Sequence, residues 1–136
     1  MKSKVFLLTL LAVLLAACQP ASPAELPGGQ VVLSPGETVA SGDGNITITF
    51  LEVLADSRCP ADAMCVWQGN VSVLLQVVSG GQTRQVTLTL GELLAGDVNL
   101  VTVNGATVSL VDVQPYPLAS QHTDPTHYEV TLDIHN

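Results

Sequence analysis

The residues with the clearest chemical potential are two cysteines, Cys59 and Cys65, which enclose five residues. Two thiols this close in sequence can form a structural disulfide or a redox-active pair. Reactive pairs are typical of a C-x-x-C spacing at the start of a helix, where the thiolate is stabilised, and this segment has neither feature. In an extracytoplasmic protein such a pair is oxidised by default. We therefore predict a structural disulfide between Cys59 and Cys65.

Charged and aromatic side chains flank this pair, and each allows two interpretations. Trp67, the only tryptophan, is expected to pack on the disulfide and the edge of the core, or else to be presented to a ligand. Arg58 lies near Asp56 and Asp62 in the sequence, so we expect it to pair with a carboxylate and brace the loop. The alternative is an arginine that binds an anion or contacts a partner. Together with Gln68, these residues form the candidate binding loop.

A second cluster lies near the C-terminus, where His122, Asp124 and His127 fall within six residues. Imidazole and carboxylate groups bind zinc or copper, and His135 would be a distant fourth ligand. The spacing matches no established metal signature, however, and Asp124 followed by Pro125 is also a good turn former. The sequence is compatible with two interpretations of this cluster, a zinc or copper site and an ordinary polar turn.

Motifs that indicate catalysis are absent from the sequence. It contains no Gly-x-Ser-x-Gly nucleophile motif and no glycine-rich phosphate loop between a strand and a helix. No serine is paired with His122 or His127 by its sequence context. We therefore predict a protein that is not an enzyme and, apart from the zinc or copper hypothesis, has no cofactor.

The N-terminal segment predicts export and a lipid anchor. Residues 1–17 combine two early lysines with an apolar run too short to span a membrane, which is typical of a signal peptide. The sequence Leu15-Ala16-Ala17-Cys18 resembles the lipobox of bacterial lipoproteins. This resemblance implies that Cys18 becomes the lipidated first residue, carrying acyl chains such as palmitate that hold the protein to a membrane of the bacterial cell envelope, outside the cytoplasm. Residues 18–29, rich in Pro, Ser and Gly, are expected to be a flexible tether.

The charge of the mature chain limits its partners. Loss of Lys2 and Lys4 leaves Arg58 and Arg84 against 12 acidic residues, so the net charge becomes minus 10. A surface of this sign repels nucleic acid, which we exclude as a partner, and it favours solubility or a cationic partner.

Residues 30–136 are expected to form one all-β domain, because short runs rich in β-branched residues alternate with Gly, Asn, Asp and Pro. About seven strands predict an antiparallel two-sheet β-sandwich of the immunoglobulin-like kind, with a small closed β-barrel as the alternative. The run 46–54 is expected to be buried on both faces toward its end, and Asn104-Gly105 to form a type I′ hairpin turn. The expected strands are 30–33, 46–54, 70–78, 83–90, 99–103, 107–113 and 127–135, with 37–40 as a further short candidate.

The loop around the cysteines resembles a motif of a known family. Asp56-Ser57-Arg58-Cys59-Pro60, then Cys65, Trp67 and Gly69, is similar to a pattern found in small bacterial secreted proteins and lipoproteins. The resemblance implies an envelope location and a β-sandwich, and it implies no activity. We expect a non-catalytic, lipid-anchored module that presents the disulfide-braced loop to a protein, peptide or glycan partner. The alternative is an extracytoplasmic metal-binding protein that uses the His/Asp cluster.

Overall fold

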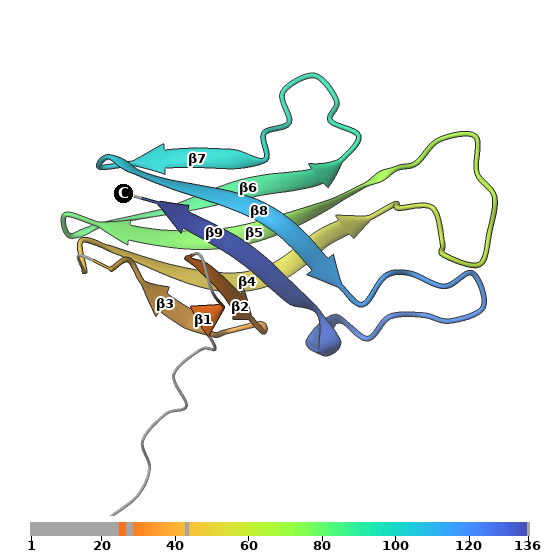
Figure 1. The fold of residues 1–136 in the computed structure, drawn as a ribbon, viewed down its shortest axis with the longest axis horizontal. Helices are drawn as coiled ribbons and strands as arrows, with labels where there is room; N and C mark the ends of the chain where they lie inside the picture. The colour runs from red at the N-terminus through yellow and green to blue at the C-terminus, as the bar shows by residue number, and fades with distance from the viewer. Residues whose placement is uncertain (1–24, 27–28, 43, 136) are drawn as a thin grey trace, which may run out of the picture.

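Two antiparallel β-sheets packed face to face make up the domain (Figure 1). The computed structural model describes residues 25–26, 29–42 and 44–135. The predicted signal peptide over 1–17 and the predicted lipidation site at Cys18 lie outside the described residues. Within the described part of the chain the sheets do not close into a barrel, so the predicted β-sandwich is confirmed and the barrel alternative is wrong.

Each sheet is built mainly from strands that are neighbours in the chain. The first sheet has five strands in the order β1-β2-β9-β8-β7, and the second has four in the order β3-β4-β5-β6. The strands are β1 (Glu25–Leu26), β2 (Gln30–Leu33), β3 (Thr38–Ala40), β4 (Ile46–Asp56), β5 (Asn70–Ser79), β6 (Gln82–Gly91), β7 (Leu100–Val103), β8 (Ala106–Gln114) and β9 (Glu129–His135). A 3-10 turn, η1 (Pro125–His127), precedes β9.

The connections between strands are mostly hairpins. In addition, β2 pairs with β9, which joins the beginning and the end of the domain through partners such as Val32 and Thr131. The chain passes from one sheet to the other between β2 and β3 and again between β6 and β7. The strands thus follow one another around the sandwich in chain order, whereas immunoglobulin domains reach the same two-sheet packing through Greek-key connections.

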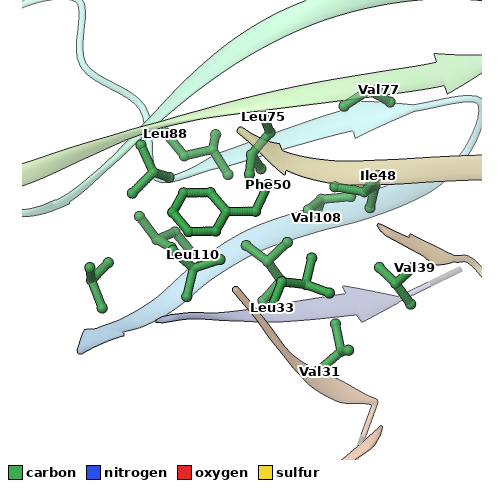
Figure 2. Packing of buried hydrophobic residues seen from close by; sticks show 14 of the residues in the cluster. Val31, Leu33, Val39, Ile48, Phe50, Leu75, Val77, Leu88, Val108 and Leu110 are labelled. Carbon is green, nitrogen blue, oxygen red and sulfur yellow. The ribbon is translucent and has the colours of Figure 1, made fainter. Parts of the chain in front are cut away.

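The core lies between the sheets and is formed by the alternate residues of each strand. Every second residue of β5, from Val71 to Val77, is fully buried, as the alternation predicts. Figure 2 shows the ring of Phe50 surrounded by aliphatic side chains from both sheets, including Leu75 and Leu88 from one and Leu33 and Leu110 from the other. Burial of these apolar side chains is the main driving force for closing the sandwich.

The end of β4 differs from the prediction. The apolar residues after Phe50 were expected to be buried on both faces, yet Leu54 is 50% exposed. The pairing of β4 with β5 shifts register between Phe50 and Glu52 and again between Val53 and Ala55. Such irregularities turn side chains away from the face that simple alternation assigns to them. Leu54 therefore faces outward at the end of β4.

One hairpin turn agrees with the prediction, and the start of the first sheet differs from it. Asn104 and Gly105 both have positive φ angles, 49° and 89°, as a type I′ turn requires. The sheet begins earlier than predicted, because β1 lies inside the expected tether of residues 18–29 and pairs with β2. The peptide bond between Gln114 and Pro115 is cis.

Candidate functional site

The candidate binding loop connects β4 to β5 and extends beyond the end of the two sheets (Figure 1). Cys59 and Cys65 form the predicted disulfide within it, with their Cα atoms 5.9 Å apart. The disulfide closes a small ring at the outer part of the loop. It therefore fixes the shape of the loop and does not link the two sheets.

Arg58 anchors the base of the loop. Its side chain is buried, and only 7% of the residue is exposed. It donates from Nε to Asp56 Oδ1 at 2.9 Å and from Nη2 to Asp56 Oδ2 at 2.6 Å, a two-point pairing with the carboxylate. It also donates to the carbonyl oxygens of Val113 at 2.6 Å and Pro115 at 3.0 Å. The predicted bracing role of Arg58 is confirmed, with Asp56 as the carboxylate.

Two tyrosines, Tyr128 buried and Tyr116 exposed, contact this network. The guanidinium of Arg58 lies over the ring of Tyr116, 4.6 Å from its centroid. The hydroxyl of Tyr128 donates to Asp56 Oδ2 at 3.1 Å. Burial on its own would raise the pKa of Asp56, but the hydrogen bonds and charge of Arg58, together with the Tyr128 hydroxyl, bring it below its ordinary value of 3.8. The partners of Asp56 and Arg58 are thus internal to the fold.

The disulfide loop also holds a second loop, the 115–128 segment that leads into β9. The backbone nitrogen of Ala119 donates to Asp62 Oδ1 at 2.7 Å, and that of Ala61 donates to the carbonyl of Pro117 at 3.0 Å. Asp62, one of the candidate binding residues, therefore joins the two loops and does not pair with Arg58. Sequence reasoning missed this contact, because Asp62 and Ala119 are 57 residues apart.

The outer part of the disulfide loop exposes apolar side chains. Trp67 is 39% exposed and lies outside the buried core. Met64 and Val66 are fully exposed, and Gln68 is also exposed. Sequence reasoning did not single out Met64 and Val66, although both are large apolar residues in a stretch without strand alternation.

Close backbone packing holds the point where the loop returns to the sheet. Gly69 has a φ angle of 74°, and a Cβ atom at this position would overlap the carbonyl oxygen of Ser57. The side-chain amide of Asn70 donates to the carbonyl of Glu92 at 2.9 Å. The apolar tip, defined as Met64, Val66 and Trp67, therefore stands on a base that is fixed at both ends.

The His/Asp cluster forms a capped turn. Asp124 Oδ1 accepts from the backbone nitrogen of Thr126 at 2.9 Å and from its hydroxyl at 2.7 Å, so Asp124 caps η1. These hydrogen bonds lower the pKa of Asp124. Among the described residues, no three His, Cys, Asp or Glu side chains are grouped closely enough to hold a metal ion. A zinc or copper site at His122, Asp124 and His127 stays a prediction.

His135 does not belong to this cluster. It lies eight residues beyond His127, at the far end of β9, and an extended chain of that length spans about 25 Å. Its Nε2 atom lies 2.9 Å from Asp133 Oδ1. The fourth metal ligand suggested by the sequence is therefore too far from the other three.

Comparisons of the chain with protein-family models, with curated proteins and with solved structures found no match. In the described part of the chain, no helix has the length and apolar character needed to cross a membrane. The candidate functional features of the described chain are therefore the two connected loops and the exposed apolar tip.

Proposed function

We propose that this protein is a lipid-anchored module of the bacterial cell envelope that binds a protein or peptide partner through the apolar tip, without catalysis. The observation that carries the proposal is the exposure of Met64, Val66 and Trp67 on a loop whose base is fixed. Large apolar side chains on a surface are informative when they are grouped, and tryptophan is enriched among the residues that dominate binding energy.

The rigidity of the base supports this proposal. Binding by a loop is weakened by the entropy lost when the loop becomes ordered, and a loop already fixed before binding loses less. Here the disulfide, the Arg58 network and the Asp62 contact with Ala119 all fix the loop in the free protein. The tip can therefore act as a preformed contact surface.

The charge of the domain indicates the chemistry of the partner. Arg58 is buried, so its charge is compensated inside the fold by Asp56. Asp62 lies beside the tip in the sequence, and Arg84 is far away on β6. A partner with an apolar recess surrounded by basic residues would complement this surface.

The location of the module is part of the same proposal. The resemblance of Leu15-Ala16-Ala17-Cys18 to a lipobox supports lipidation at Cys18 and attachment to a membrane. Replacing Cys18 with serine is expected to release the protein from the membrane fraction into the soluble fraction. Unchanged membrane association of the Cys18→Ser variant would contradict the anchor.

The contact can be tested by photo-crosslinking in the cells that make the protein. A photoreactive amino acid at position 66, in place of Val66, is expected to give one discrete adduct, and the same substitution at Val111, exposed on β8, serves as the control. The adduct should disappear in Trp67→Ala and in the Cys59→Ala, Cys65→Ala variant. Once identified, the purified partner should bind wild-type protein and not Trp67→Ala. Equal adducts from both positions, or binding that survives Trp67→Ala, would refute the proposal.

A further inference from the structure

Two hollows share His122 in their linings, and neither lining includes a residue of the apolar tip. The larger, of about 330 Å³, lies between the exposed end of β4 and the 115–128 segment. The smaller, of about 180 Å³, is lined by residues of the 115–128 segment alone. The residues Gln121, His122 and Thr123 line both hollows. The larger volume falls at the lower end of the range for pockets that bind small molecules.

The lining of the hollows combines flat apolar surfaces with hydrogen-bonding groups. Leu54 and Pro117 contribute apolar surface to the larger hollow, and Tyr116 contributes an exposed ring to the smaller one. Gln121 and His122 can each donate and accept hydrogen bonds. A sugar ring has the complementary chemistry, because its C–H faces are apolar and its rim of hydroxyl groups both donates and accepts.

Charge narrows the class of ligand further. Among the described residues that line the two hollows, none is lysine or arginine, and the carboxylates are Asp56 and Asp124. Asp56 is paired with Arg58, and Asp124 caps η1, so each has partners within the fold. An anionic ligand would find no lysine or arginine side chain in either lining to pair with. We infer that the hollows around His122 bind a short neutral saccharide.

The walls of this site are held in place by the buried network. Arg58 donates to the carbonyl of Pro115 and lies against the ring of Tyr116, which fixes the start of the 115–128 segment. The contacts from Ala61 to Pro117 and from Ala119 to Asp62 hold its middle. The disulfide loop therefore acts as a support for the hollows, and the site exists before a ligand arrives.

The inference is tested by saturation-transfer NMR on the protein purified in detergent from the cells that make it. The neutral probes are maltotriose, cellotriose and tri-N-acetylchitotriose, and trigalacturonic acid is the anionic probe. At least one neutral trisaccharide is expected to give transfer signals, and the anionic probe none. Replacing His122 or Tyr116 with alanine should raise the Kd at least about ten-fold, a loss of about 1.4 kcal/mol. Both side chains are exposed, and circular dichroism checks that each variant is folded.

Two control variants separate this site from the rest of the surface. His135→Ala alters a histidine at the other end of β9 and should leave the Kd unchanged. Trp67→Ala alters the apolar tip and should also leave it unchanged, so a failure of the protein-binding proposal does not affect this one. The inference is overturned if no neutral trisaccharide gives a signal, if binding survives in both His122→Ala and Tyr116→Ala, or if Trp67→Ala abolishes it. Stoichiometric zinc binding that depends on His122, without any saccharide signal, would overturn it in favour of the metal hypothesis.

Discussion

Replacing Arg58 with methionine tests whether the buried network holds the two loops together. The substitution keeps a long, unbranched side chain but removes the guanidinium, so the apolar stem can still occupy its place. The carbonyl oxygens of Val113 and Pro115 then lose the guanidinium as donor. The Asp56 carboxylate loses its cation and keeps only the hydrogen bonds from the Tyr128 hydroxyl and from the backbone nitrogen of residue 58. Arg58→Met should therefore lower the free energy of unfolding strongly.

The size of this effect follows from the burial of the pair. The side chains of Arg58 and Asp56 are only 5% and 9% exposed, so the carboxylate left behind cannot recover its hydration without movement of the loops. Removing one partner of a buried ion pair costs about 3–5 kcal/mol, and each buried carbonyl left unpaired costs about 1–3 kcal/mol. These two costs count partly the same lost interactions, so they do not add. We expect a loss of about 3–5 kcal/mol, which is a large part of the stability of a domain of this size.

The loss should depend on pH, because Asp56 is the group left without its partner. In the wild-type protein the pKa of Asp56 is lowered, so its contribution to stability is present above the unfolded value and fades as the pH falls through the lowered native value. In Arg58→Met the Asp56 carboxylate has lost its cationic partner, so it destabilises the fold while it is charged. Protonation of the carboxylate removes this destabilisation. The difference between the two proteins should thus be largest near about pH 7 and shrink below about pH 4.

Urea unfolding followed by far-UV circular dichroism, at several pH values, measures this difference. The matched control is Arg84→Met, because Arg84 is exposed on β6 and a surface substitution of this kind changes stability by less than about 0.5 kcal/mol. A loss of less than about 1 kcal/mol for Arg58→Met, or a loss that stays the same from about pH 7 to about pH 3.5, would refute the reasoning.

Three further substitutions test other parts of the same end of the molecule. The Cys59→Ala, Cys65→Ala variant should unfold about 2 kcal/mol more easily and keep its β-sheet spectrum, because the closed loop is short; complete failure to fold would contradict this. Gly69→Ala should be more destabilising in urea unfolding than Gly36→Ala. Both glycines have positive φ angles, but only at Gly69 would the added Cβ atom overlap a backbone oxygen. Equal losses of stability would count against that contact. Tyr128→Phe should cost about 1 kcal/mol in the same measurement, less than Arg58→Met, because it removes one hydrogen bond to Asp56; a larger loss would place the Tyr128 hydroxyl at the centre of the network.

Much of the fold follows from local sequence patterns. The alternation in β5 and β9 predicts which residues face the core, because successive side chains of a strand point to opposite faces. The end of β4 does not follow this rule. Its run of apolar residues predicts burial on both faces of the strand. The irregular pairing that exposes Leu54 depends on how β5 pairs with β4, and the sequence of β4 alone does not contain that information.

The candidate site shows the same division between local and distant contacts. The pairing of Arg58 with Asp56 could be predicted because the two residues are close in sequence and opposite in charge. Its bonds to the carbonyls of Val113 and Pro115 could not, because every residue has a carbonyl group and nothing in the sequence marks these two. The exposure of Trp67 also depends on the loop extending past the sheets, a property of the assembled sandwich.

The pairing of β2 with β9 has a consequence for the order in which the chain assembles. The hairpins from β4 to β6 and from β7 to β9 join residues that are near in sequence, so they can form early. The first sheet is complete only when the last strand is present, because β9 lies between β2 and β8. A chain that stops before Glu129 leaves one edge of β2 and one edge of β8 without a pairing strand. Unpaired strand edges are a template for aggregation. Synthesis must therefore extend through β9 before the first sheet can be completed.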